Sequence, residues 1–137
     1  IRDRYRKVEN ILNKIYKKKL LNAEEKLFLK CHDGLITLQL SDIIYIQTEN
    51  KLLILHTIHG DVQSSQRMSE LEKRLSKKQF FRCHNSYMVN FDYVEGVKKD
   101  SVLIKDKVQK LKTIPISKYK KEEFMRALAR YVGKWEN

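Results

Sequence analysis

The chain has 137 residues, the size of one ordinary domain, which leaves no room for a second independent core. It is 42% hydrophobic with only four Gly and one Pro, and this composition argues against a disordered or fibrous chain. Lys and Arg number 29 against 17 Asp and Glu, a formal net charge of +12, so a polyanionic partner is the first hypothesis.

Residues 1–22 are predicted to form an amphipathic helix. Its apolar side chains recur at intervals of three and four residues: Tyr5, Val8, Ile11, Leu12, Ile15 and Tyr16. The other faces are mostly Arg, Lys and Asn, as expected of a linker or a dimerising helix. We therefore assign residues 1–25 to a linker or N-terminal helix and residues 26–137 to the folded domain.

The next segment alternates short β-favouring runs with turn signals. The runs are Leu27–Lys30, Leu35–Leu40, Ile43–Thr48, Leu52–Thr57 and Val62–Ser65. Asp33-Gly34 between the first two is the strongest short-range signal for a hairpin. The pattern predicts sheet built from consecutive hairpins, with aromatic residues such as Phe28 and Tyr45 in the core.

A short helix interrupts the strands at Met68, Leu71 and Leu75. Further β-favouring runs follow it: Phe80–Arg82, Ser86–Asn90, Tyr93–Val97, Val102–Ile104 and Val108–Ile114. Ser117 is a candidate N-cap for a final helix, whose predicted apolar face comprises Tyr119, Phe124, Leu128, Tyr131 and Val132. Because strands and helices do not alternate regularly, we predict a β-rich fold, mainly antiparallel with α+β character.

The excess positive charge is concentrated at the two ends of the chain. Residues 1–30 carry +6, residues 31–97 carry −1 and residues 98–137 carry +7. No apolar run approaches the roughly 20 residues that cross a bilayer, and two cysteines are too few for a disulfide framework. We expect a cytoplasmic protein, and the first residue, Ile1, suggests a fragment of a longer chain.

Neither metal binding nor catalysis is expected. The dipeptides Cys31-His32 and Cys83-His84 could supply zinc ligands, but adjacent residues on a strand point to opposite faces and cannot close a chelate. The chain has no Gly-rich phosphate loop and no nucleophile elbow. We predict a protein that is not an enzyme, without catalytic residues, cofactor or metal.

The most specific stretch runs from Phe80 to Asn90, Phe-Phe-Arg-Cys-His-Asn-Ser-Tyr-Met-Val-Asn. Arg, His and Asn side chains can donate hydrogen bonds to phosphates and base edges, and Asn can bond adenine through two atoms. An equally good interpretation is a polar turn between helix and strand, in which Asn and Ser only cap backbone groups. The residue types alone do not distinguish DNA binding from a purely structural turn.

This stretch resembles the hallmark motif of the LytTR family, the LytR/AgrA-type DNA-binding domain of bacterial response regulators. The motif has the form Phe-x-Arg-x-His-Asn/Arg-Ser-x-x-Val-Asn, and this chain matches it at Phe80 or Phe81, Arg82, His84, Ser86, Val89 and Asn90. The early strand Ser41–Ile46 and the segment Ile116–Tyr119 also resemble family features in the correct order. The resemblance implies an elongated antiparallel β fold that binds DNA through loops.

The resemblance implies three regions that contact DNA. They are the early loop at Glu49, Asn50 and Lys51, the central motif at His84 and Asn85, and the closing segment at Ser117 and Lys118. The final helix has no acidic residue before Glu122, an arrangement that suits an anionic partner at this end. The predicted DNA-binding residues are Asn50, Lys51, Arg82, His84, Asn85, Ser86, Ser117, Lys118, Lys120 and Lys121.

The resemblance also implies partners. Family members typically follow a phosphorylatable receiver domain, answer to a sensor kinase and bind direct repeats in promoter DNA as dimers. The predicted function is therefore sequence-specific binding of double-stranded DNA by the output domain of a two-component response regulator, without a membrane partner. The alternatives are a basic module for RNA or a membrane surface, and a protein interaction domain.

Overall fold

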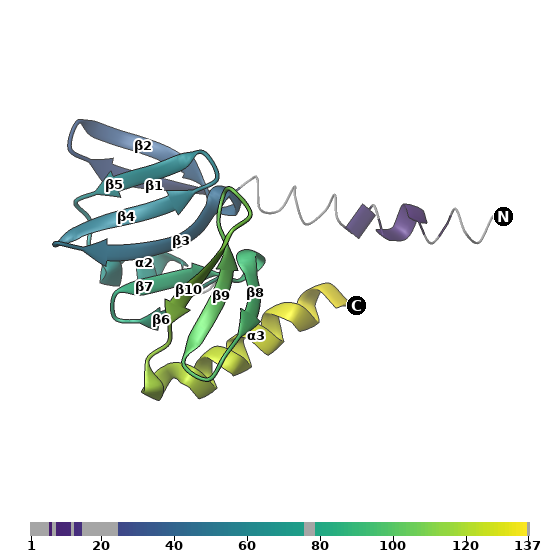
Figure 1. Cartoon of the computed structure of the whole chain (residues 1–137). Helices are drawn as coiled ribbons and strands as arrows, with labels where there is room; N and C mark the ends of the chain where they lie inside the picture. The colour runs from purple at the N-terminus through teal and green to yellow at the C-terminus, as the bar shows by residue number, and fades with distance from the viewer. Residues whose placement is uncertain (1–5, 7, 12, 15–24, 76–78, 137) are drawn as a thin grey trace.

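The computed structural model describes residues 6, 8–11, 13–14, 25–75 and 79–136, which form mainly antiparallel sheet with short helices (Figure 1). The predicted β-rich fold class is confirmed. Within the predicted N-terminal helix, residues 6, 8–11 and 13–14 are helical. The remainder of that prediction lies outside the described residues.

A two-stranded hairpin begins the domain. It consists of β1 (Lys26–Cys31) and β2 (Gly34–Gln39), with Cys31 paired to Gly34 across the turn. Gly34 has a φ of 139°, in the region that L side chains rarely adopt, so the predicted Asp-Gly turn depends on this glycine. The 3-10 turn η1 (Leu40–Asp42) then leads into the main sheet.

The main sheet has five strands joined mostly by tight turns. Its spatial order is β5 (Gly60–Ser64), β4 (Leu52–Thr57), β3 (Ile43–Glu49), β7 (Tyr87–Asn90) and β6 (Phe80–His84). The short helix α2 (Met68–Leu75) connects β5 to β6 and buries the three apolar residues that predicted it. Together with the inner face of the β1–β2 hairpin, α2 and this sheet enclose the first hydrophobic core.

A second core lies on the other side of β3 and β7. It is enclosed by a three-stranded sheet of β8 (Val94–Val97), β9 (Ser101–Lys105) and β10 (Leu111–Pro115), and by α3 (Lys121–Glu136). The 3-10 turns η2 (Phe91–Tyr93) and η3 (Lys118–Lys120) flank that sheet. Phe124 anchors α3, because its fully buried ring packs edge-on against Phe81 at 5.5 Å between centroids.

Three features at the C-terminal end differ from the predictions. The last strand begins at Leu111 rather than Val108, because the Asp106 carboxylate accepts hydrogen bonds from the N–H groups of Val108 and Lys110 and closes a turn there. Ser117 makes no side-chain capping bond, since η3 intervenes before α3 begins. Tyr119 lies in η3, outside the helical phase, and is 92% exposed instead of buried.

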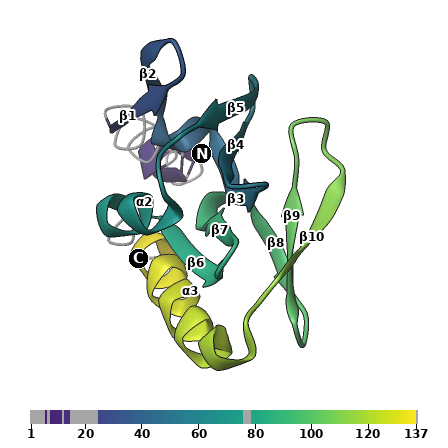
Figure 2. The same ribbon diagram turned by 90° about the vertical axis from the view of Figure 1, so that its left-hand side faces the viewer.

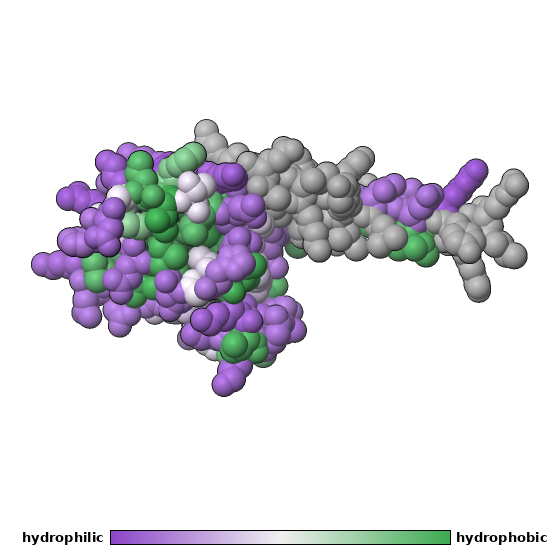
Figure 3. Space-filling view, turned by 90° about the horizontal axis from the view of Figure 1, so that it is seen from above, coloured by the Kyte–Doolittle hydropathy of each residue, from purple (hydrophilic) through white to green (hydrophobic). Residues whose placement is uncertain are grey.

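Phe28 was also expected in the core and is 59% exposed. Successive side chains of a strand face opposite sides, so the burial of Leu27 and Leu29 turns Phe28 outward. Leu35 on β2 is likewise 68% exposed. Figure 3 views the molecule from the end that carries this hairpin and shows hydrophobic surface surrounded by polar side chains.

Candidate nucleic-acid interface

Asn50 and Lys51 form the two-residue turn between β3 and β4. Their φ angles are 51° and 66°, the left-handed region that a type I′ hairpin turn requires at both central positions. Asn adopts this region readily, whereas Lys does not, and the pairing of Glu49 with Leu52 holds Lys51 there. Both side chains are exposed. The turn therefore presents an amide and a cation at the tip of the hairpin.

Asn85 and Ser86 form the corresponding turn between β6 and β7, closed by the pairing of His84 with Tyr87. The Ser86 N–H donates to Nδ1 of His84 at 3.1 Å. In the neutral imidazole the proton is therefore on Nε2, which leaves that nitrogen as a donor. Asn85 is exposed at the tip of this turn. Its amide is the most accessible base-reading group of the central motif.

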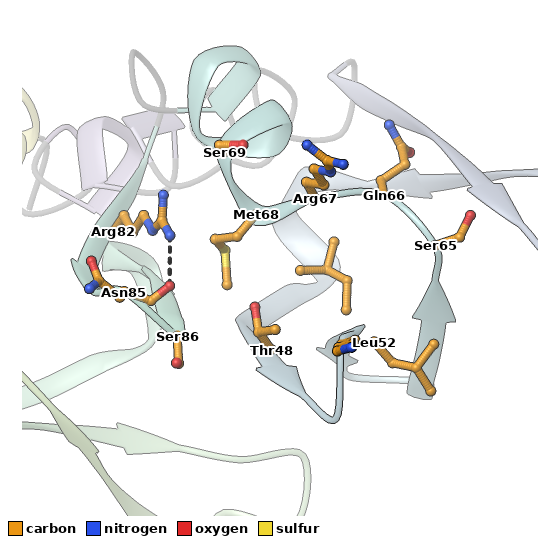
Figure 4. Close-up of a pocket in the computed structure, with 12 residues that line it drawn as sticks. Thr48, Leu52, Ser65, Gln66, Arg67, Met68, Ser69, Arg82, Asn85 and Ser86 are labelled. Carbon is orange, nitrogen blue, oxygen red and sulfur yellow. Dashed lines mark hydrogen bonds between the residues drawn. The ribbon is translucent and has the colours of Figure 1, made fainter.

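A backbone hydrogen bond joins these two turns. The Thr48 N–H donates to the Ser86 carbonyl at 2.9 Å, which sets the tip of the β3–β4 hairpin beside the tip of the β6–β7 hairpin. A hollow of about 530 Å³ lies between the turns and the segment that leads from β5 into α2 (Figure 4). It is lined by Thr48, Lys51, Leu52, Leu53, Ser65, Gln66, Arg67, Met68, Ser69, Arg82, Asn85 and Ser86.

The sequence patterns predicted no binding residue in the segment between β5 and α2. Arg67 lies there, exposed, and no ion-pair partner for its guanidinium occurs among the described residues. Residues 31–97 carry a net charge of only −1, so the charge distribution indicated binding residues at the two ends of the chain. The polar run Ser64–Arg67 immediately before the short helix was the available signal.

Arg82 lines the same hollow but is held within the protein. Its Nη1 lies 3.2 Å from Oε1 of Glu72 on α2, and its Nη2 donates to the Asn85 carbonyl at 2.7 Å (Figure 4). The side chain is only 20% exposed. The predicted DNA-binding arginine therefore supports the turn that carries Asn85.

The predicted lysines at the start of α3 are not equivalent. Lys118 is exposed in η3, whereas Lys120 donates through Nζ to the Arg82 carbonyl at 3.3 Å. Lys121 donates to the carbonyl of Lys98 at 2.6 Å and also to that of Lys99, and so ties α3 to the β8–β9 turn. Of the three, Lys118 is the one whose amino group is free to bind an anion among the described contacts.

Ser117 serves as a backbone link to the central motif. Its N–H donates to the Cys83 carbonyl at 2.7 Å, which places the start of η3 beside β6. The β3–β4 turn, the β6–β7 turn and the start of α3 consequently lie on one side of the molecule, at the left in Figure 1. That side faces the viewer in Figure 2, where the three follow one another from top to bottom.

Other residues of the central motif are structural. Asn90 is fully buried and donates through Nδ2 to the Ile43 carbonyl at 2.7 Å, while its Oδ1 accepts from the Asp92 N–H at 2.9 Å. Cys83 is fully buried as well, and burial raises the pKa of its thiol to about 12. The motif therefore divides into an exposed tip and a buried stem.

The described part of the chain offers no cluster of three or more His, Cys, Asp or Glu side chains suited to a metal ion. Cys83 lies in the second core, and Cys31 packs against the first. No helix within residues 25–75 and 79–136, or among the described N-terminal residues, is long and apolar enough to span a membrane.

Comparisons with known proteins agree with this arrangement. Residues 33–129 match the family model described as the LytTr DNA-binding domain. A solved LytTr DNA-binding domain from Bacillus cereus superposes with a TM-score of 0.62 at 22% identity, covering 77% of this chain and 97% of that one. This structural similarity establishes the fold.

Two kinds of full-length relative also match. The transcriptional regulatory protein LytR of Staphylococcus aureus (strain bovine RF122 / ET3-1) is 28% identical over 93 residues, which are 68% of this chain and 38% of the relative. The sensory transduction protein LytT of Bacillus subtilis (strain 168) is 28% identical over 75 residues, 55% of this chain and 31% of the relative. The matched part thus spans only about a third of each relative.

Proposed function

Because the chain belongs to the LytTr DNA-binding domain family, we propose that it directs a transcriptional regulator to specific promoter sequences, which it contacts through its turns. DNA binding is the function of the family, and it takes precedence over the RNA, membrane-surface and protein-interaction alternatives.

We assign base reading to the tips of the two joined turns. Asn85 and Asn50 present amides able to bond adenine through two atoms, and Lys51 can donate to guanine. His84 adds an Nε2 donor beside Asn85. The observation that carries this assignment is the bond from Thr48 to Ser86, because it holds both tips at one place on the surface.

We assign phosphate contacts to residues that flank these tips. Lys118 belongs to η3, directly before α3, whose start lies on the same side of the molecule as the two tips (Figure 2). Arg67 lines the hollow that Lys51 also lines. Ser86 and the Ser117–Lys120 segment can donate further hydrogen bonds to the DNA backbone. Contacts of this kind position a protein on the duplex without selecting sequence. Affinity should accordingly fall with salt, with a slope of about −0.9 in log K against log[salt] for each neutralised phosphate.

The larger protein is proposed to be a cytoplasmic two-component response regulator. Its receiver domain would precede residues 26–137, receive phosphate from a sensor kinase and act through the N-terminal segment. Two copies would bind adjacent direct repeats as a homodimer on the DNA. The similarity to LytR and LytT supports this organisation, and no enzymatic step is assigned to the DNA-binding domain itself.

Selection of bound sequences from random duplex DNA tests the proposal. The chain should enrich a motif, and two copies of it in direct repeat should be recovered at a fixed spacing. Binding of the recovered duplex is then compared with a scrambled duplex of the same composition at physiological salt. Equal affinity for both duplexes would contradict sequence-specific recognition.

A further inference from the structure

Arg82 occupies a central position behind the proposed reading surface. Its guanidinium joins the Glu72 carboxylate, at 3.2 Å, to the Asn85 carbonyl, at 2.7 Å. Its own carbonyl accepts the bond from Lys120. One residue therefore connects α2, the tip of the β6–β7 turn and the start of α3.

The β6–β7 turn needs this support because its hairpin is irregular. The register shifts between Phe81 and His84, so the ladder is irregular at Arg82 and Cys83, and only the His84–Tyr87 pair lies between this irregularity and the turn. Three other contacts then define the tip: the Ser86 N–H on His84, the Thr48 N–H on the Ser86 carbonyl, and Arg82 on the Asn85 carbonyl. The last of these orients the peptide between Asn85 and Ser86 and with it the Asn85 side chain.

Glu72 in turn determines where the Arg82 guanidinium lies. Arg82 Nη1 donates to Glu72, whereas Arg82 Nε is buried and has no hydrogen-bond partner among the described residues. Without the carboxylate, the guanidinium would gain more by moving toward water or a phosphate than by remaining on one carbonyl. The Glu72 side chain is 37% exposed, so the ion pair contributes little to overall stability.

We propose that Glu72 is a positioning residue for DNA recognition: it touches no DNA itself, but holds Arg82 against the Asn85 carbonyl and thereby fixes the base-reading amide. This inference rests on the proposed function of Asn85. It assigns an acidic residue a favourable role on a surface that binds a polyanion. Whether removal of the Glu72 charge tightens or weakens DNA binding therefore distinguishes a simple effect of charge from positioning.

If Glu72 acts only through its charge, Glu72→Gln should change affinity for the preferred duplex in one direction. If Glu72 positions Arg82, the variant should change that affinity in the opposite direction. Removing a negative charge near the duplex should tighten binding to every DNA sequence. Loss of positioning should instead weaken the preferred duplex by at least about fivefold, the lower limit for one lost base contact. Binding to a scrambled duplex should stay unchanged or become tighter. Specificity should fall while nonspecific affinity does not.

Glu70→Gln is the matched control. Glu70 lies on the same helix and is exposed, and its carboxylate accepts a hydrogen bond from Gln66 at 3.4 Å, so the variant makes the same charge change without freeing Arg82. It should bind both duplexes at least as tightly as the wild-type chain. Arg82→Lys keeps the positive charge but lacks the fork that spans two acceptors. It should reproduce the loss seen with Glu72→Gln, and the double variant should lose little more.

The experiment titrates fluorescent preferred and scrambled duplexes with each variant of the chain at one salt concentration. In parallel, amide resonances of Asn85 and Ser86 are recorded without DNA, and should shift in Glu72→Gln but not in Glu70→Gln. Unshifted amides, or equal or tighter binding of the preferred duplex by Glu72→Gln, would overturn the proposal. If the wild-type chain does not distinguish the duplexes, the proposed function fails, while the amides still decide whether Glu72 holds the turn.

Discussion

The Thr48 N–H donates a hydrogen bond of 2.9 Å to the Ser86 carbonyl, and so joins the backbones of two hairpins that carry different parts of the proposed interface. The relative position of the two tips is consequently fixed by main-chain atoms. Substitution of an exposed side chain at either tip should change what the surface binds without moving the surface. Because main-chain atoms place the tips and side chains would make the contacts, single substitutions can test each proposed DNA contact separately.

Asn85→Ala should lower affinity for the preferred duplex by about 1–3 kcal/mol, the usual value of a two-atom base contact. Asn85 is exposed, and its bond to Arg82 uses the main-chain carbonyl, with no side-chain bond among the described residues, so the melting temperature should not change. Duplex titration and thermal unfolding of the same preparation measure both quantities. A lower melting temperature would instead identify Asn85 as part of the structural stem.

Asn90→Ala should produce the opposite pattern. The buried Asn90 amide bonds the Ile43 carbonyl and the Asp92 N–H, and its removal leaves both groups without these partners. We expect a loss of at least about 2 kcal/mol in the free energy of unfolding. Chemical denaturation measures this loss. Any DNA still bound by the folded fraction should show the wild-type order of sequence preference, and a changed order would contradict a purely structural role.

The two asparagines illustrate what the sequence could predict. Alternating apolar runs and turn signals located nearly every strand, and the central motif indicated the segment to which we assign base reading. The residue types could not distinguish the exposed Asn85 from the buried Asn90, because that difference depends on the carbonyls of β3 and η1 that enclose Asn90. Whether a motif residue contacts DNA or the core is determined by tertiary packing.

Contacts between segments that lie far apart in the chain could likewise not be predicted from the sequence. The interaction of Arg82 with Glu72 requires α2 to lie against β6. The hollow that Arg67 and Lys51 both line requires the β5–α2 segment to lie near the β3–β4 turn. Local turn chemistry explains the wrong boundary at Val108, where the Asp106 carboxylate satisfies two N–H groups that would otherwise extend the ladder. Phe28 was misplaced because an apolar run does not show which face of a strand is buried.

The start of α3 offers a second pair of contrasting variants. Lys118→Gln should weaken all duplexes by similar factors and make the salt slope shallower by about one unit, because Lys118 is exposed and free to neutralise a phosphate. Lys121→Gln should instead lower the melting temperature, since it removes the bonds to the carbonyls of Lys98 and Lys99. Salt titrations and thermal unfolding distinguish them, and an unaltered slope in Lys118→Gln would remove this residue from the interface.

His56 should make stability depend on pH. Its ring stacks on Tyr45 with 4.2 Å between centroids, and its Nδ1 lies 2.9 Å from Oδ1 of Asp61. Burial lowers the pKa of His56 below 6.5 and outweighs Asp61, which raises it, while Lys112 lowers it further. The unfolded chain then binds the proton more readily, so the free energy of unfolding should fall as pH drops below about 6.5.

Denaturation at a series of pH values measures this dependence. His56→Gln should remove the part of the decline that sets in below pH 6.5. His32→Gln is the matched control, because His32 is exposed in the β1–β2 turn, and it should retain the wild-type decline. A His56 titration midpoint above 6.5 in the folded chain would reverse the expected sign.

Arg67 tests whether the interface extends beyond the three regions implied by the family resemblance. Its exposed guanidinium lines the hollow beside Lys51 and has no ion-pair partner among the described residues, so DNA phosphate is the acceptor that the proposed function supplies. Arg67→Gln should weaken preferred and scrambled duplexes alike and make the salt slope shallower by about one unit. Arg74→Gln removes the same charge from α2, where Arg74 donates to the Phe28 carbonyl at 3.1 Å, and should change the slope less. Equal slopes in the two variants would show that Arg67 acts only through net charge, whereas an altered sequence preference in Arg67→Gln would make it a base-reading residue.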